Sequence, residues 1–388
     1  MRGEPERQMP LFHVFEVEDR IRPDHPLRDI KRRTDRILAS LDDQFAKAYS
    51  HTGRPSVPPE RLLKAMLLMC LYTIRSEQQL CEQIDVNLLY RWFLDMHPSD
   101  EAFDATVFSK NRKRLEEHGL TKAFFDKVVS EALTQGLCSE HFSVDGTTIE
   151  SWASAKSFQP KDETEQSNDS NKGGSSGANG FKPSNPSVDF RGQKRTNETH
   201  VSRTDPESRL YRKSKGKEAK LAHMGHILSE NRNGLILGIS ASEANGTAER
   251  DEAAKLAIEL HATQGRKPKT LGADKGYDDG DFLNALEDLG IEPHIPLKGE
   301  PADPKTVTDK TRLPGIEARR RMKERLEKEA YRLSQKCRKK VEECFGWLKV
   351  VAGLDRSKVV GRWKLLQFLQ IGAAAFNLVK MVRLAPAM

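Results

Sequence analysis

The segment HFSVDGTTIES, residues 141–151, decides the fold that we expect for this chain. Its apolar start, His141–Val144, is typical of a strand and ends at Asp145 and a glycine. The segment KTLGADKGYDD, residues 269–279, repeats the pattern, with Asp274 after an apolar run. Open α/β sheets bind ligands at the carboxyl ends of their strands, so two such aspartates on neighbouring strands can share a divalent cation. A turn or helix-cap role for each aspartate is the alternative.

Short apolar runs and helical stretches alternate around these two segments. NRNG, residues 231–234, has the composition of a hairpin turn. The order strand, hairpin, helix, strand, helix, strand indicates an α/β catalytic domain with a mixed sheet over residues 136–388. Besides the strands at 141–144 and 270–273, the expected elements are strands at 221–229, 235–242 and 291–295 and helices at 249–263 and 279–289.

Residues 1–135 have the pattern of an all-helical N-terminal domain. Pro58 and Pro59 precede an apolar-periodic run, and Ser76 with Gln79 three residues later predicts a capped helix start. Such a bundle of short helices is compatible with a helix-turn-helix DNA reader and also with a structural scaffold, so a DNA-binding or accessory role is expected. The expected helices lie at 62–74, 76–85, 88–94, 105–118 and 121–135.

Within the α/β domain, the composition changes at residues 157–200 to Ser, Asn, Gly, Lys and Pro, including NKGGSSGANG at 171–180. This stretch has too few apolar residues to offset the entropy of ordering it. We therefore expect a disordered insertion at about residues 157–200.

The positive charge of the chain is concentrated in two windows. The 388 residues hold 64 Lys and Arg against 57 Asp and Glu, a formal net charge of +7. Residues 191–220 carry +6 and residues 319–349 carry +7, so the remainder is slightly acidic. A localised positive field is typical of a surface that meets a polyanion, and a solvated helix face or flexible basic tail is the alternative.

The sequence also excludes several classes of protein. No apolar run approaches the roughly 20 residues of a membrane span, and no signal peptide is visible at the N-terminus. We therefore expect a cytoplasmic protein with no membrane partner. The five cysteines form no CxxC pair and no zinc-ligand spacing, so disulfides and structural zinc are not expected.

The second basic window is expected to form one long helix, residues 319–349. On such a helix Arg338, Glu342 and Lys349 share one face, within about 40° of each other. A glutamate between two bases can bind a metal while its neighbours hold phosphates; a plain ion pair is the alternative. Two Mg²⁺ ions about 3.5–4 Å apart, held by carboxylates, suit phosphodiester chemistry.

Together these residues resemble those of bacterial insertion-sequence transposases, which carry an Asp-Asp-Glu triad on a ribonuclease H-like fold, and specifically the insertion-sequence-five group. The resemblance implies that Asp145, Asp274 and Glu342 are the catalytic and metal-binding triad. It runs through most of residues 50–380. The segments that carry it are GRPSVPPERLLKAMLL, SVDGTTIES, TDPESRLYRKSKGKEAKLAHMGHILSENRNGLI, ADKGYDD and CRKKVEECFGWLK.

The signature of that group places Tyr, Arg, Glu and Lys at fixed spacings around the glutamate. Arg338, Glu342 and Lys349 match it, whereas Gln335 stands at the tyrosine position, so we expect a changed phosphate contact there and not lost catalysis. Arg338 and Lys349 are implied to neutralise phosphate charge. A basic loop is implied to follow the DNA backbone through Arg209, Arg212, Lys213, Lys215, Lys217 and Lys220.

The resemblance implies a DNA transposase that uses two Mg²⁺ ions, with Mn²⁺ as a substitute. Such an enzyme hydrolyses the phosphodiester at the transposon ends and transfers the released 3′-hydroxyl into target DNA. Its implied partners are double-stranded terminal inverted repeats, target DNA and further copies of the chain in a dimer or larger synaptic assembly. Two alternatives stand beside it: a ribonuclease H-like nuclease or domesticated transposase without strand transfer, and a helix-turn-helix DNA-binding regulator.

Overall fold

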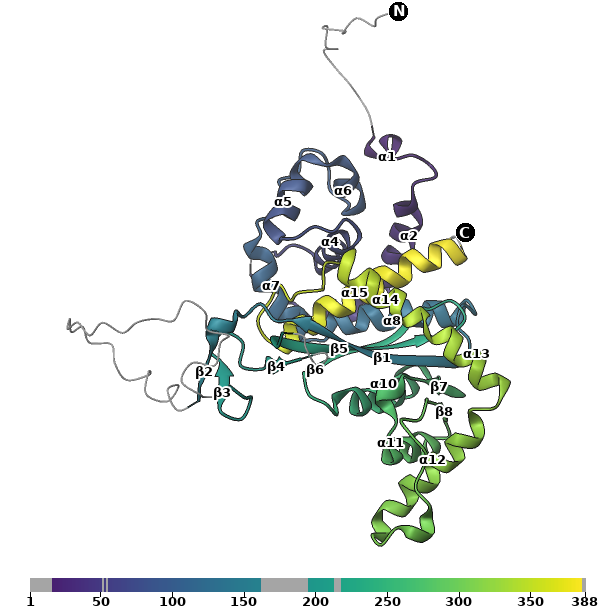
Figure 1. Cartoon of the computed structure of the whole chain (residues 1–388). Coiled ribbons are helices and arrows are strands. Elements are labelled where there is room, and N and C mark those ends of the chain that lie inside the picture. The colour runs from purple at the N-terminus through teal and green to yellow at the C-terminus, as the bar shows by residue number, and fades with distance from the viewer. Residues whose placement is uncertain (1–15, 51, 54, 162–194, 213–217, 386–388) are drawn as a thin grey trace, which may run out of the picture.

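A mixed six-stranded sheet lies at the centre of the computed structural model, which describes residues 16–50, 52–53, 55–161, 195–212 and 218–385 (Figure 1). The longest strands, β1 and β5, lie side by side and antiparallel in its middle. The strands of this sheet are β1 (His141–Glu150), β4 (Arg209–Tyr211), β5 (Lys220–Glu230), β6 (Ile236–Glu243), β7 (Thr270–Gly272) and β8 (Glu292–His294).

The order of these strands identifies the fold. From one edge the sheet runs β6, β5, β1, β7, β8, and the short β4 also pairs with β5. Strand β5 is antiparallel to both β6 and β1, whereas β7 and β8 run parallel to β1. This is the strand order of the ribonuclease H-like fold, so the predicted fold class is confirmed.

The hairpin between β5 and β6 has the predicted turn at residues 231–234. Gly234 adopts a left-handed φ of 74°, a conformation that costs glycine little. The carboxylate of Glu230 is fully buried and accepts the backbone N–H of Arg232 at 2.8 Å and that of Asn233 at 2.5 Å. The turn is thus fixed by a buried acid as well as by its glycine.

Helices cover both faces of the sheet (Figure 1). On one face α10 (Ala248–Gln264) packs on β5 and β6, with α11 (Gly280–Asp288) beside it and α12 (Leu313–Arg325) against α11. On the other face lie α14 (Lys340–Val350) and α15 (Arg362–Leu384). The predicted helices at 249–263 and 279–289 are therefore confirmed to within a residue at each end.

The helical N-terminal region contains three helices that its polar sequence did not reveal, α1, α2 and α3. In α2 the buried residues Leu27, Ile30, Ile37 and Leu38 recur at helical spacing among many charged ones. Ser76 caps α5 as predicted, accepting the N–H of Gln79. The helices of this region are α1 (Val17–Arg20), α2 (Pro26–Ala39), α3 (Asp42–Ala48), α4 (Pro59–Leu71), α5 (Glu77–Val86), α6 (Leu88–Phe93), α7 (Thr106–Glu117) and α8 (Leu120–Thr134).

The helix α15 corrects the expectation that no apolar segment approaches the length of a membrane span. Its 23 residues have the length and composition of such a span, but 78% of its most apolar window is buried inside the protein. It packs on β6 and also on α2, α4 and α8, so it lies between the sheet and the N-terminal helices. Fully buried Asn377 connects it to β6. The side-chain amide of Asn377 accepts a hydrogen bond from the N–H of Ile236 at 2.8 Å and donates one to the C=O of Ile236 at 2.7 Å.

The expected disordered insertion at 157–200 is partly structured where it is described. Its two ends form a small antiparallel ladder of β2 (Phe158–Pro160) and β3 (His200–Ser202), and residues 162–194 lie outside the described residues. Ser202 is fully buried, and Phe158 stacks on His200 at 5.4 Å between ring centroids. Aromatic packing at the two ends, which the overall composition conceals, stabilises this ladder.

Candidate active site

Asp145 and Asp274 lie at corresponding positions beside the two central parallel strands. The pairing of β1 with β7 ends where Ser143 stands opposite Gly272. Each aspartate lies two residues beyond that last pair, and the backbone at Asp274 is still extended. Since side chains two residues apart in an extended chain point to the same face, the two carboxylates leave the sheet at the same level and on the same side.

The prediction that Asp145 ends a strand is wrong, whereas that for Asp274 is confirmed. Strand β1 continues to Glu150, and Asp145 stands opposite Ile227 within the antiparallel ladder. The apolar run stops early because Gly146, Thr147 and Thr148 follow Asp145, although these residues remain in the strand. Asp274 does follow β7, and its side chain accepts the N–H of Gly276 at 2.7 Å in a short 3₁₀ turn.

The basic segment 319–349 is not the single long helix that we expected. It divides into the end of α12, then α13 (Glu329–Arg338) and α14, because Lys328 is extended and Lys339 separates the last two helices. Arg338 therefore ends one helix, and Glu342 lies in the first turn of the next. Arg338, Glu342 and Lys349 therefore do not share one face of a continuous helix.

Arg338 nevertheless links two of the predicted triad residues. Its Nη1 lies 3.6 Å from Oδ2 of Asp145, and its Nη2 lies 3.9 Å from Oε1 of Glu342. The side chains of Arg338 and Asp145 are 19% and 20% exposed, whereas that of Glu342 is 64% exposed. At the junction between α13 and α14, Arg338 thus lies between Glu342 and Asp145 of the central strand.

The electrostatics of Asp145 show that the three acids influence each other. Burial, together with the charges of Asp274 and Glu342, raises the pKa of Asp145 to about 6. The N–H of Gly146, 2.8 Å from Oδ1, and the charge of Arg338 act in the opposite direction. Mutual repulsion of carboxylates is relieved when a cation binds between them, so the site is electrostatically suited to one.

The chemistry of this donor set fits a hard divalent cation, since all three side chains offer carboxylate oxygens. As the side chains stand, no group of three His, Cys, Asp or Glu within the described part of the chain is arranged to hold a metal ion. The exposed side chain of Glu342 can rotate towards Asp145 without disturbing the core. Asp145, Asp274 and Glu342 remain the residues that would hold the ion.

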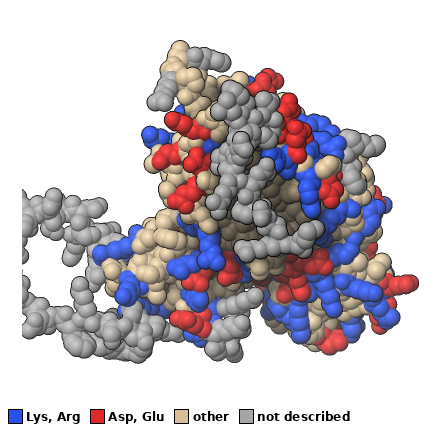
Figure 2. Space-filling model, turned by 90° about the horizontal axis from the view of Figure 1, so that it is seen from above, with Lys and Arg blue, Asp and Glu red and all other residues tan. Residues whose placement is uncertain are grey.

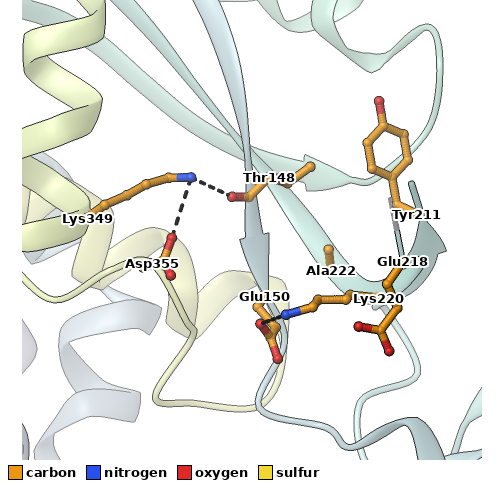
Figure 3. A pocket seen from close by; sticks show the side chains of 8 residues that line it. All are labelled: Thr148, Glu150, Tyr211, Glu218, Lys220, Ala222, Lys349 and Asp355. Carbon is orange, nitrogen blue, oxygen red and sulfur yellow. Dashed lines mark hydrogen bonds and ion pairs between the residues drawn. The ribbon is translucent and has the colours of Figure 1, made fainter. Parts of the chain in front are cut away.

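Two of the predicted phosphate-binding lysines line one cavity of about 350 Å³, drawn in Figure 3. Lys349 donates to the carbonyl of Thr148 at 3.1 Å and lies 3.6 Å from Oδ1 of Asp355. Lys220 pairs with Glu150 at 3.0 Å. Both lysines therefore lie beside β1, and a phosphate that bound there would compete with the two carboxylates.

Of the other predicted phosphate contacts, Gln335 and Arg209 have protein partners. Gln335 donates its amide N–H to the carbonyl of Ala273 at 3.2 Å and to that of His294, which fastens α13 to the ends of β7 and β8. Arg209 pairs with Glu243 at 2.9 Å. Arg212 is exposed at the end of β4. The remaining members of the basic loop lie outside the described residues: Lys213, Lys215 and Lys217.

Sequence reasoning missed Glu249 and Tyr277. Glu249, in the first turn of α10, lies over Gly146, where a Cβ atom would come within 2.9 Å of its carboxylate oxygen. Tyr277 is fully buried; burial raises its pKa well above the usual value, and the charges of Glu249, Asp145 and Asp274 add to that. The available signal was the glycine after Asp145, since glycine within a strand often marks a close approach.

The positive charge is less concentrated than the two windows predicted. Figure 2 shows Lys and Arg side chains interspersed with Asp and Glu on the face it presents. In α12, Arg319 pairs with Asp278 at 2.8 Å, and Arg321 and Arg325 both pair with Glu287 at 2.6 Å. These three arginines are therefore neutralised by carboxylates of the protein itself.

A ribonuclease H-like sheet with acids beside its two central parallel strands defines a class of enzymes that act on phosphodiester bonds. Two family models match the chain: a transposase domain, DUF772, at residues 15–114, and a transposase DDE domain at residues 192–378. The chain therefore belongs to the DDE-type transposases and is a DNA transposase. The DDE match includes Asp274 and Glu342 and begins after Asp145.

Solved structures add little to this assignment. Two structures of Mos1 transposase, a paired-end complex with the left transposon end and a strand transfer complex, share 12% and 13% identity with this chain. The matches cover 79% and 80% of this chain and 81% and 82% of theirs, with TM-scores of 0.20 and 0.19. Scores this low carry no argument about this protein. No curated protein matches the chain in sequence.

Proposed function

We propose that this transposase cleaves DNA at the ends of a mobile element with Asp145, Asp274 and Glu342 as its catalytic and metal-binding triad. The observation that carries the proposal is the placement of Asp145 and Asp274 two residues beyond the last β1–β7 pair, with Arg338 linking Asp145 to Glu342. No other part of the described sheet offers acids from neighbouring parallel strands beside a third acid on a helix.

The chemistry that we assign to the site is hydrolysis followed by transfer of the 3′-hydroxyl into target DNA. Two Mg²⁺ ions, or Mn²⁺ in their place, would supply Lewis-acid charge and an activated water to this reaction. The three carboxylates would hold them, and Arg338 is close enough to Asp145 to neutralise a phosphate oxygen nearby. Lys349 and Lys220, beside the same strand, would bind flanking phosphates.

The further assignments follow from the sequence resemblance. We assign the chain to the insertion-sequence-five group, with Gln335 at the tyrosine position of its signature. Its partners would be terminal inverted repeats, target DNA and further copies of the chain in a dimer or synaptic assembly, acting in the cytoplasm. We also propose a boundary near residue 135 between an N-terminal DNA-binding or accessory domain and the catalytic domain. The position of α15 supports close coupling of the two.

The alternatives differ in what happens after cleavage. A nuclease or domesticated transposase without strand transfer would use the same acids, so only the products separate it from the proposal. A helix-turn-helix regulator would need none of the three acids, and the match to a DDE domain favours an enzyme. Matching inverted repeats around the gene, with short direct duplications outside them, would favour a mobile element.

The test uses duplex oligonucleotides that carry the flanking repeats. Asp145→Asn and Asp274→Asn should each abolish Mg²⁺-dependent cleavage and strand transfer, because each removes a carboxylate ligand and keeps the size of the side chain. DNA binding, measured by fluorescence anisotropy in EDTA, should change little. Asp43→Asn, at an exposed position on α3, is the matched control and should keep full activity. Wild-type cleavage by the Asp145 variant would refute the triad.

A further inference from the structure

A basic groove of about 430 Å³ opens where the N-terminal helical region meets the far end of β1. Three cationic side chains line it, Arg75 from the segment between α4 and α5, and Arg356 and Lys358 from the segment between α14 and α15. Trp152, two residues after β1, forms another part of its wall. Figure 1 shows these parts of the chain close together although they are far apart in the sequence.

The charges of this basic groove are not balanced from within. No carboxylate is among the described residues that line it. The acids nearest along the chain have other partners: Asp355 lies 3.6 Å from Lys349, and Glu77 pairs with Arg112. The groove thus differs from the cavity beside Lys349 and Lys220, where each lysine faces a carboxylate.

Lys358 is held where a bound anion would stabilise it. Its side chain is half-buried, and its Nζ donates to the carbonyl of Ile74 at 3.3 Å. Burial lowers the pKa of Lys358, and the like charge of Arg75 lowers it further. A phosphate placed between two cations would remove this repulsion and replace lost hydration with charge-assisted hydrogen bonds.

An exposed aromatic ring accompanies the cations. Trp152 is 55% exposed, and the guanidinium of Arg356 lies 5.8 Å from its ring centroid and donates to its backbone carbonyl at 3.4 Å. Grooves that follow a nucleic-acid strand combine cations for the phosphates with aromatic rings for sugars and bases. The lining therefore fits DNA better than it fits an acidic protein segment, which would leave the ring without a matching partner.

The groove lies in line with the proposed active site. Strand β1 carries Asp145 and ends five residues later at Glu150, a rise of about 17 Å at roughly 3.3 Å per residue. That length corresponds to about five nucleotides of B-form DNA at about 3.4 Å each. A strand bound at the carboxylates and running along β1 would reach the groove at this distance.

We propose that the basic groove formed by Arg75, Arg356, Lys358 and Trp152 binds the phosphate backbone of the DNA about five nucleotides from the phosphodiester that is cut. The inference rests on the proposed function for the position of the cut. It assigns a DNA-contacting role to a surface shared by the N-terminal region and the C-terminal segment, outside the basic loop that the sequence indicated.

The test is the salt dependence of DNA binding in EDTA, with a duplex that spans one terminal repeat. Each lost phosphate contact should lower the slope of log affinity against log salt by about 0.9, which is about eightfold in affinity at 0.1 M salt. The double variant Arg75→Gln, Arg356→Gln should therefore lose about 1.8 in slope and about 60-fold in affinity. The control, Lys255→Gln with Lys323→Gln, changes the net charge equally at 68% and 55% exposed positions on α10 and α12.

An unchanged slope in the groove variant, or an equal loss in the control, would overturn the inference. Arg75→Gln alone alters only an exposed side chain, so it repeats the test if the double variant unfolds, and its slope should fall by about 0.9. Cleavage by the wild type and by Asp145→Asn is measured separately. Loss of cleavage in Asp145→Asn with an unchanged slope in the groove variant would reject the groove and retain the active site.

Discussion

Replacing Asp145 by asparagine should stabilise the metal-free protein at neutral pH. Burial raises the pKa of this carboxyl from its usual 3.8 to about 6, and its side chain is only 20% exposed. The folded state therefore binds the proton more tightly than the unfolded state, and stability falls as the pH rises from 3.8 to about 6. At about 1.36 kcal/mol per pH unit, the ionised carboxylate costs about 3 kcal/mol above that range.

Asparagine has nearly the same size and carries no charge, so the variant avoids this cost. Urea unfolding in EDTA should show a gain in unfolding free energy of about 3 kcal/mol at pH 7.5 and about 1.5 kcal/mol at pH 5. Glu342→Gln is the matched control, because its side chain is 64% exposed and its removal should change the unfolding free energy by less than about 0.5 kcal/mol. Added Mg²⁺ should reduce the difference between Asp145→Asn and the wild type by stabilising the wild type alone.

The contrary outcome is an Asp145→Asn variant that is no more stable than the wild type at pH 7.5, or whose gain in unfolding free energy is the same at both pH values. Either result would mean that the carboxyl is not held in a buried, negatively charged environment. A higher unfolding free energy of the variant at neutral pH would show that the Asp145 carboxylate lowers the stability of the wild type. Such a cost is common where function needs a buried charge.

Two further predictions concern the sheet and its helical cover. Burial lowers the pKa of His226 to about 4, so the unfolding free energy should fall by about 3 kcal/mol as the pH decreases from 6.5 through 4. In the His226→Gln variant, urea titrations should show an unfolding free energy that changes less with pH over this range. Gly280→Ala would place a Cβ atom 2.4 Å from Gly315 Cα, so it should lower the melting temperature by overpacking α11 on α12, at about 1–3 kcal/mol, whereas Gly299→Ala meets nothing within 4 Å and should not.

The sheet was predictable because most of its strands have a recognisable local sequence pattern. The hairpin pairs apolar runs around NRNG, and β5, β6, α10 and α11 begin and end within a residue or two of their predicted limits. The pattern failed at β1, where Asp145, Gly146, Thr147 and Thr148 interrupt the apolar run beside the proposed site. It also failed at residues 319–349, where basic residues suit a helix whether or not it is interrupted. Composition describes the environment of a segment and not its continuity.

The candidate site was predictable only in part. Spacing and resemblance named Asp145, Asp274 and Glu342, whose catalytic roles stay predictions, but no sequence pattern reports that Arg338 bridges two of them. Glu249 approaches from a helix about a hundred residues further along the chain, and the cations of the basic groove are divided between segments almost three hundred residues apart. Such contacts depend on tertiary packing between distant segments, which produces no periodic pattern in the local sequence.

The position of α15 has a consequence for synthesis. Helices α2, α4 and α8 leave the ribosome long before residue 362, yet the hydrophobic surface that they share with α15 stays open until that helix emerges. The nascent N-terminal half therefore waits, incompletely folded, for more than two hundred residues of translation. A stop codon shortly before residue 362 would therefore release a chain in which the core shared by the N-terminal helices and the sheet lacks α15 and leaves its hydrophobic surface exposed.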